Sequence, residues 1–220
     1  MDKIAALYLA HLNPFTKAHE EIINRLKKKY TVYIFPVRFL LNGKEINTRS
    51  FPFSYELRKL MIREVFPNDN NIFISPNYTF YSPFIKYFPP IFSPYSWRIR
   101  DQVVNTISEK KFVSYTGDPV ERYALRVYRF NPIKAKRLPI SASHIKELIY
   151  KEATDVNSRN KNIESKKSEN LKEREMWEDK VPTQVVKIIK ENWSVIDKYA
   201  TAQDETIKIF GVKFPRRGFF

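Results

Sequence analysis

The fold of this chain is decided by the stretch Ala10-His11-Leu12-Asn13-Pro14-Phe15-Thr16-Lys17-Ala18-His19, which joins an apolar run to an amphipathic one. The apolar run, Ile4 to Leu9, has the length of a buried parallel strand. The amphipathic run, Glu20 to Lys29, has helical spacing, and Thr16 is placed to cap that helix. The sequence therefore predicts strand, tight loop and helix, a turn whose free backbone N–H groups attract phosphate.

Composition narrows the classes of protein that remain. The chain has 220 residues, with 39 Lys and Arg against 24 Asp and Glu, and its net charge of +15 favours anionic partners. It has no cysteine and three histidines, which argues against a disulfide framework, a thiolate metal site and a histidine-rich metal centre. Because we find neither a membrane-spanning apolar run nor a secretory signal, we expect a cytoplasmic protein with no membrane partner.

The elements after the first helix alternate in type. Tyr30 to Val37 predicts a second strand, which completes a right-handed βαβ unit. A polar stretch with a turn at Asn42-Gly43 follows, and Ser54 then caps a helix that runs to about Val65. Further along we expect a strand at 71–74, a helix at 97–109, a strand at 112–115, a helix at 120–125 and a strand at 126–130. This alternation predicts an α/β fold with a mostly parallel sheet and helices on both faces.

The chain is expected to divide into three parts. Residues 1–153 form the α/β domain, and within it the aromatic and proline-rich insert 77–96 is expected to lie over the core as a loop, with a lid or oligomer contact as the alternative. Residues 154–176 form a charged insert, either a mobile loop or a solvated helical arm. Residues 177–220 supply a C-terminal helix at 183–199 and a tail, packed on the main domain, in which 206–214 is a weak candidate for an edge strand.

Two short motifs connect the sequence to a known family. Asn13-Pro14-Phe15-Thr16-x-x-His19 resembles the (His/Thr)-x-Gly-His motif of the nucleotidylyltransferase superfamily, with Ala18 in place of glycine. Ile140-Ser141-Ala142-Ser143-His144-Ile145-Lys146 resembles the superfamily's Ile-Ser-Ser/Gly-Thr-x-Ile-Arg motif, with Lys146 in place of arginine. A lysine binds phosphate as a point charge, without the bidentate fork of arginine.

Two further segments resemble one branch of that superfamily. Tyr115-Thr116-Gly117-Asp118-Pro119 is similar to the Tyr-Ser-Gly-Asn-Pro of nicotinamide-nucleotide adenylyltransferases, with Asp118 in place of asparagine. Phe51-Pro52-Phe53-Ser54-Tyr55-Glu56-Leu57-Arg58 is similar to the Pro-Phe-Thr-x-x-Glu-Arg segment of their archaeal type. The resemblance covers roughly Ile4 to Tyr199 with two inserts, and we find no family counterpart for the tail.

The resemblance implies a Rossmann-like nucleotidylyltransferase fold with a C-terminal helical region, and a reaction. The enzyme would transfer AMP from ATP to nicotinamide or nicotinate mononucleotide, forming a dinucleotide and pyrophosphate, with Mg²⁺ held by ATP and water rather than by protein side chains. The implied catalytic residues are His19, Thr16 and Lys146. The implied ATP-binding residues are Ala10, His11, Asn13, Phe15, Thr16, His19, Gly117, Asp118, Ser141, Ser143 and Lys146, and the implied mononucleotide-binding residues are Trp97 and Asn13.

Two other functions stay open. A sister transferase, such as a phosphopantetheine adenylyltransferase or a cytidylyltransferase, would use the same motifs on a different acceptor. An inactive protein of this fold could instead use the +15 charge to bind nucleic acid, but we find no RNA-recognition motif or zinc-finger spacing, so nucleic acid ranks last. We also expect a homo-oligomer.

Overall fold

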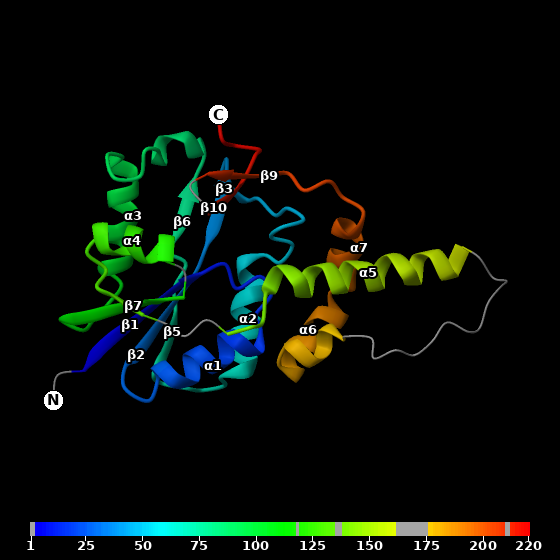
Figure 1. The fold of residues 1–220 in the computed structure, drawn as a ribbon, viewed down its shortest axis with the longest axis horizontal. Helices are drawn as coiled ribbons and strands as arrows, with labels where there is room; N and C mark the ends of the chain where they lie inside the picture. The colour runs from blue at the N-terminus through cyan, green and yellow to red at the C-terminus, as the bar shows by residue number, and fades with distance from the viewer. Residues whose placement is uncertain (1–2, 118, 135–137, 162–175, 210–211) are drawn as a thin grey trace.

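The computed structural model describes residues 3–117, 119–134, 138–161, 176–209 and 212–220 (Figure 1). Its centre is a parallel sheet with the strand order β5-β2-β1-β7-β8. The strands are β1 (Ile4–Ala10), β2 (Thr31–Pro36), β5 (Ile72–Ile74), β7 (Lys111–Thr116) and β8 (Pro132–Lys134). The chain proceeds outward from β1 through β2 to β5 and then returns to the other side of β1. The carboxyl end of β1 is therefore the switch point at which such sheets bind ligands.

Both faces of the sheet are buried, because β1 is apolar on both sides. Ala6 and Tyr8 point into one core and Ala5 and Leu7 into the other, as the two-residue period of a strand requires. The first core is covered by α1 (Lys17–Leu26), α2 (Tyr55–Val65) and three C-terminal helices. The second is covered by α3 (Pro94–Val104) and α4 (Pro119–Val127). None of the helices in the described ranges combines the length and the apolarity that a membrane span needs.

The C-terminal helices pack beside α2 and against one another (Figure 1). They are α5 (Ala142–Lys161), α6 (Thr183–Glu191) and α7 (Trp193–Ala200), with a 3₁₀ turn, η2 (Trp177–Lys180), before α6. Trp177 is buried, and its indole N–H donates to the Glu152 carboxylate at 2.7 Å, which ties η2 to α5. Helix α5, which contains most of the second motif, is thereby held to the first core.

A smaller layer lies beyond the carboxyl ends of β1 and β2 (Figure 1). It contains a three-stranded sheet in the order β4-β3-β6, a 3₁₀ turn and an antiparallel hairpin. These elements are β3 (Arg38–Leu41), β4 (Lys44–Glu45), β6 (Thr79–Tyr81), η1 (Phe84–Tyr87), β9 (Thr206–Ile209) and β10 (Val212–Pro215). Phe39 of β3 and Phe214 of β10 pack with their ring centroids 5.3 Å apart, so the end of the chain joins the second core.

The Rossmann-like expectation is confirmed: the sheet is parallel, helices cover both faces, and a helical region follows. The polar stretch after the second strand is more ordered than predicted, since it forms β3 and β4 around the Asn42-Gly43 turn. In the insert 77–96, Phe84 and Tyr87 are buried, whereas Phe92 exposes 82% of its surface. The insert also contains β6 and η1, so it is not the plain loop that its prolines predicted.

The strand predicted at 126–130 is wrong. Its aromatic and β-branched residues favour a strand, but α4 extends to Val127, and the strand β8 lies at Pro132–Lys134. Arg129 adopts a left-handed conformation with φ of 57°, and the Phe130 N–H donates to the Leu125 carbonyl at 2.9 Å. Helix ends close in this way, and burial of Leu125 and Phe130 outweighs strand propensity.

Two C-terminal expectations are also corrected. The single helix expected at 183–199 is two helices, because the Asn192 side chain donates to the Ile188 carbonyl at 2.9 Å and competes with the helical hydrogen bonds. The tail forms the hairpin β9–β10 rather than one edge strand. Of the charged insert 154–176, the beginning continues α5 to Lys161, and 162–175 lie outside the described residues.

Candidate active site

The first motif forms the start of α1. Thr16 is the N-cap: its hydroxyl accepts the His19 N–H at 3.4 Å, and its own N–H donates to His19 Nδ1 at 3.0 Å. This reciprocal pair satisfies two of the N–H groups that a helix start leaves without partners. Because Nδ1 accepts a hydrogen bond, the proton of the neutral imidazole must be on Nε2.

His19 is electrically neutral at physiological pH. Burial, and secondly the charge of Lys146, lowers the pKa of His19 to about 4. The sequence suggested that His19 would meet the anion beside the helix start. The structure makes it a neutral hydrogen-bond donor through Nε2, placed at the positive end of α1.

Asn13 joins the first motif to the segment before α2. Its amide nitrogen donates to the Phe53 carbonyl at 2.8 Å, and its amide oxygen accepts the Phe53 N–H at 3.2 Å. The side chain is 2% exposed, so both bonds are formed away from water. In this structure Asn13 therefore fixes the shape of the loop, and its predicted contacts with ATP and the mononucleotide stay predictions.

The second motif meets the first at Lys146. The side chain is buried, and Nζ donates to the Asn13 carbonyl at 2.9 Å, across 133 positions in the sequence. Burial lowers the pKa of Lys146 to about 8, and repulsion from Lys213 adds to the effect. The pKa of Lys146 therefore lies close to physiological pH. Shifted pKa values of this kind are typical of functional sites.

The hydroxyls of the second motif are arranged differently from the expectation. Ser141 Oγ accepts the His144 N–H at 3.5 Å, at the start of α5, while the Ser143 side chain is exposed. Both serines are exposed, and Ser141 is the one that caps the helix. Their predicted contacts with phosphate stay predictions.

The third motif reaches the same edge of the sheet. β1 and β7 are parallel and pair Leu7 with Ser114, so Gly117 lies level with Ala10. The Thr16–His19 turn and Gly117 thus flank the switch point. Asp118, predicted to contact the nucleotide, lies outside the described residues.

Three other predicted site residues, Ala10, Phe15 and Trp97, make contacts with other parts of the protein. Phe15 is fully buried and packs edge-on against Phe66, and the Ala10 carbonyl accepts the Val37 N–H at 3.1 Å. Trp97 lies on α3, where its indole N–H donates to the Ile91 carbonyl at 2.9 Å and its ring meets Tyr128 edge-on. These contacts of Trp97 are to neither phosphate motif, so the structure does not bring it together with Lys146 and His19.

Arg58 belongs to the site although the sequence did not single it out. It is 3% exposed, and it donates to the His11 carbonyl at 2.7 Å and to the Glu45 carboxylate at 3.1 Å. Burial lowers the pKa of Arg58 to about 10, so it stays charged. The available signal was its position at the end of the segment that resembles Pro-Phe-Thr-x-x-Glu-Arg.

His11 faces the cations from the inner side. Its ring stacks on Phe51, with centroids 4.5 Å apart and planes 11° from parallel. Burial lowers the pKa of His11 to about 3, and the charges of Arg58, Lys146 and Lys213 add to the effect. The His11 imidazole is therefore neutral at the carboxyl end of β1, under the influence of three positive charges.

The cavity at this point is small. It is about 10 Å³, and His11, Asn13, Glu45, Phe51 and Arg58 are among its lining residues. That is room for about one water molecule, whereas nucleotide pockets measure hundreds of Å³. This cavity, as it stands, is therefore too small for a nucleotide.

A metal ion held by the protein alone needs several donor side chains in one place. In the described ranges, no group of three or more His, Asp or Glu side chains is placed to hold one. A hard cation such as Mg²⁺ is commonly bound through one or two carboxylates plus substrate phosphates and water. That the nucleotide carries the metal ion stays a prediction.

Comparison with solved structures identifies the fold. The chain resembles a bifunctional NMN adenylyltransferase/ADP ribose pyrophosphatase from Francisella tularensis at 16% identity and a TM-score of 0.56, covering 91% of this chain and 53% of that one. The same bifunctional protein complexed with AMP and a manganese ion gives 16% identity, a TM-score of 0.50, and coverage of 90% and 54%. This chain thus spans about half the length of those structures.

Comparisons of sequence alone give no match. No family model matches the chain, and no curated protein does. At 16% identity, the structural likeness shows the fold alone: the parallel sheet and its flanking helices are arranged as in the Francisella tularensis protein. The resemblance inferred from the motifs is confirmed at that level, and the archaeal type is not singled out.

Proposed function

We propose that this protein transfers the adenylyl group of ATP to the 5′-phosphate of nicotinamide or nicotinate mononucleotide. The observation that supports it most is the 2.9 Å bond from Lys146 Nζ to the Asn13 carbonyl. It joins two motifs that both resemble phosphate-binding motifs, and it does so at the switch point of the sheet. If α5 were only a capped structural helix, a lysine side chain buried against the β1–α1 loop would not be expected.

The reaction needs alignment more than it needs a base. A phosphate oxygen of the mononucleotide forms the new bond to the α-phosphorus of ATP, while the bond from that phosphorus to the bridging oxygen breaks and pyrophosphate leaves with the electron pair. The attacking phosphate is already an anion, so no side chain must remove a proton. Catalysis then rests on positioning and on stabilising charge in the transition state.

Each group of the site has a role in this scheme. His19 Nε2–H donates to the α-phosphate, and Thr16 fixes the orientation of the ring through the two bonds described above. Lys146 and the Ser143 hydroxyl bind the outer phosphates. Mg²⁺, arriving with ATP, supplies further neutralisation of the triphosphate. Trp97 is proposed to stack on the base of the mononucleotide, although it would have to leave Tyr128 or receive the ring beside it.

A direct test uses a panel of acceptors. The full chain is incubated with Mg-ATP and, in turn, with nicotinamide mononucleotide, nicotinate mononucleotide, phosphopantetheine and a buffer blank, and released pyrophosphate is measured. Release only with the pyridine mononucleotides supports the proposal. Release with phosphopantetheine alone assigns the chain to a sister transferase. A parallel panel in which Mg-CTP replaces Mg-ATP and cytidylyltransferase acceptors are added tests the remaining alternative, and release only in that panel assigns the chain to a cytidylyltransferase.

A second test separates an enzyme from a nucleic-acid binder. We expect ATP with nicotinamide mononucleotide to raise Tm, since a ligand that binds only the folded state stabilises it. Duplex DNA should bind weakly, with Kd of roughly 10⁻⁴ to 10⁻⁶ M at physiological salt and no sequence preference. Sub-nanomolar, sequence-selective binding without a thermal shift from nucleotides would overturn the enzymatic proposal.

A further inference from the structure

The C-terminal hairpin β9–β10 lies against the site although no phosphate motif includes it. Phe214 packs on Phe39 and Phe84, and the tail continues to Gly218, whose φ is 85°. A Cβ at Gly218 would come within 3.3 Å of Leu41 and Phe84, so the tail is closely fitted to β3 and η1. Close fitting holds the hairpin at one place relative to the β1–α1 loop.

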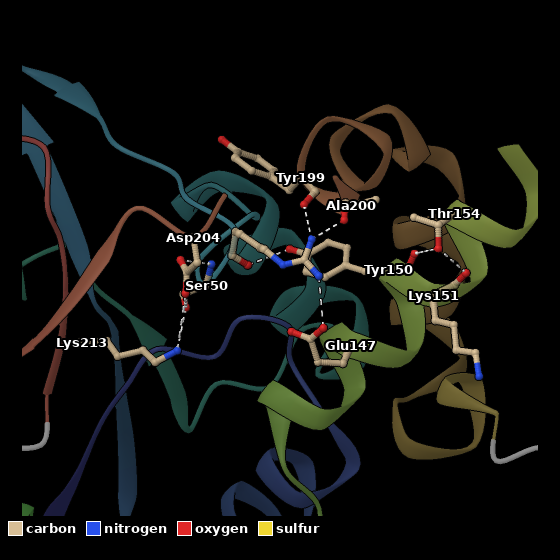
Figure 2. Close-up of polar contacts among 10 residues, drawn as sticks. Ser50, Glu147, Tyr150, Lys151, Thr154, Tyr199, Ala200, Asp204 and Lys213 are labelled. Atoms are coloured by element: carbon tan, nitrogen blue, oxygen red, sulfur yellow. Dashed lines mark hydrogen bonds and ion pairs between the residues drawn. The ribbon is translucent and has the colours of Figure 1, made fainter. Parts of the chain in front are cut away.

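A hydrogen-bond network around Ser50 holds Lys213 of this hairpin (Figure 2). Lys213 Nζ donates to Ser50 Oγ at 2.8 Å. Asp204 in turn accepts the Ser50 hydroxyl at 2.7 Å and the Ser50 N–H at 3.2 Å. The segment at Ser50 is itself anchored, since the Arg49 side chain donates to the Tyr199 and Ala200 carbonyls and its carbonyl accepts the Tyr150 hydroxyl. Lys213 is therefore held by Ser50 and Asp204, and Ser50 is held in turn by the anchored segment at Arg49.

The same hydrogen-bond network connects Lys213 with the first and second motifs. Ser50 precedes Phe51, which stacks on His11 at 4.5 Å, and His11 follows the last residue of β1. The charge of Lys213 is felt there, because it adds to the lowering of the pKa of both His11 and Lys146. Lys146, at the Asn13 carbonyl, and Lys213, at Ser50 next to Phe51, are thus both connected to the loop that follows β1.

Lys213 keeps the means to bind an anion. Asp204 Oδ2 is 3.8 Å from Lys213 Nζ and offsets part of its charge. The charge of Lys213 nevertheless acts on the buried ammonium of Lys146 on α5, whose pKa it helps to lower. The Lys213 side chain is 44% exposed, and an ammonium has three donors, of which Ser50 takes one. A multiply charged anion would relieve the repulsion and use the remaining donors.

We propose that Lys213 binds the outer phosphates of the nucleoside triphosphate, so that the C-terminal hairpin completes the site that Lys146 begins. The ligand chemistry is a pyrophosphate group, present in ATP and released as product. The inference rests on the proposed function for its substrate, but the binding of pyrophosphate by the free protein can be measured without any turnover.

The test is isothermal titration of the full chain with inorganic pyrophosphate and Mg²⁺. Lys213→Met keeps the length of the side chain and removes its charge, and it should weaken pyrophosphate affinity about tenfold. Lys213→Arg keeps the charge and should stay within about threefold of the natural chain. The matched control is Lys110→Met: Lys110 is exposed and precedes β7 at the opposite end of the sheet, so its loss should change nothing.

A second variant separates ligand binding from packing. Asp204→Asn removes the charge that offsets Lys213 and should tighten pyrophosphate binding about threefold. If Lys213 and Asp204 only stabilise the fold, the same variant should instead bind pyrophosphate more weakly and have a lower Tm. Unchanged affinity in Lys213→Met, or an equal loss in Lys110→Met, overturns the proposal. If pyrophosphate binds as described and no adenylyl transfer occurs, the proposed function fails and this inference stands; if the natural chain turns over normally and Lys213→Met binds pyrophosphate as tightly as the natural chain does, the proposed function stands and this inference fails.

Discussion

Helices α1 and α2 both begin near the carboxyl end of β1 with a hydroxyl cap, but different groups complete the two caps. At α2, Ser54 accepts the Leu57 N–H, and the Glu45 carboxylate accepts the Tyr55 N–H at 2.9 Å while it pairs with Arg58. At α1, the reciprocal cap consists of the neutral side chains of Thr16 and His19. The start of α2 thus has a carboxylate bound to its first N–H, whereas the cap of α1 is formed by neutral side chains, with Glu20 in the first turn and Lys146 nearby.

This difference separates a helix end that supports the fold from one that can receive a ligand. A helix N-terminus attracts negative charge, and a bound carboxylate satisfies that attraction permanently. At α1 the positive end, the neutral imidazole and a buried ammonium are left for a phosphate. We therefore expect changes at α2 to act on stability and changes at α1 to act on turnover.

The largest effect is expected from Arg58→Ala. The change leaves Glu45 and the His11 carbonyl without their partner, and breaking a buried ion pair from one side typically costs about 3–5 kcal/mol. Urea unfolding should show a lower midpoint with an unchanged slope. The double variant Arg58→Met with Glu45→Gln should recover part of the loss, because no uncompensated charge remains; equal losses in both variants would contradict an ion pair at this helix end.

The next effect is expected at α1, in turnover. His19→Ala removes the neutral donor, and loss of one preorganised donor lowers kcat by about 10²-fold or more. The fold should survive apart from the loss of one cap, which far-UV circular dichroism and Tm would confirm. Pyrophosphate release is the assay, and a variant with full activity would remove the nucleotidylyltransferase proposal.

Acid should destabilise the fold through two histidines, His19 at the start of α1 and His11 after β1. The pKa of His19 is lowered to about 4 and that of His11 to about 3, against about 6.5 in the unfolded chain. Between these values the unfolded state binds more protons, so the free energy of unfolding falls as pH drops from about 6.5 towards 3. Each histidine should contribute on the order of 3–5 kcal/mol to that fall.

Single variants assign the acid effect to its source. Urea unfolding at a series of pH values should give a shallower slope in His19→Ala between pH 6.5 and 4. In His11→Phe, which keeps a ring against Phe51, the slope should be shallower down to pH 3. A pH dependence identical to that of the natural chain in both variants would show that neither imidazole is held neutral by the fold.

The smallest effects compare the two caps themselves. Thr16→Ala and Ser54→Ala should each lower the free energy of unfolding by about 1 kcal/mol, the usual value of an N-cap. Only Thr16→Ala should also lower kcat, because Thr16 orients the His19 ring. If both variants lower kcat to the same degree, the two helix starts do not differ in the way proposed here.

Local chemistry was readable wherever neighbours in sequence decide it. The buried strand, the cap at Thr16 and the cap at Ser54 all follow from residues within a few positions of one another, and all three are confirmed. The errors occurred where distant packing outweighs propensity. Arg126 to Phe130 has strand-forming residues, yet Leu125 and Phe130 are buried in the second core and the segment ends a helix.

The sequence by itself determined the α/β alternation, the phosphate motifs and the positive charge, because these depend on residue type and short spacing. Only the tertiary structure decided that Lys146 binds the Asn13 carbonyl, that His19 is a neutral donor, that Arg58 binds the His11 carbonyl and that Lys213 binds Ser50. The physical reason is that burial and long-range Coulomb interactions set the charge of a side chain, and both depend on neighbours that lie up to two hundred residues away in the chain.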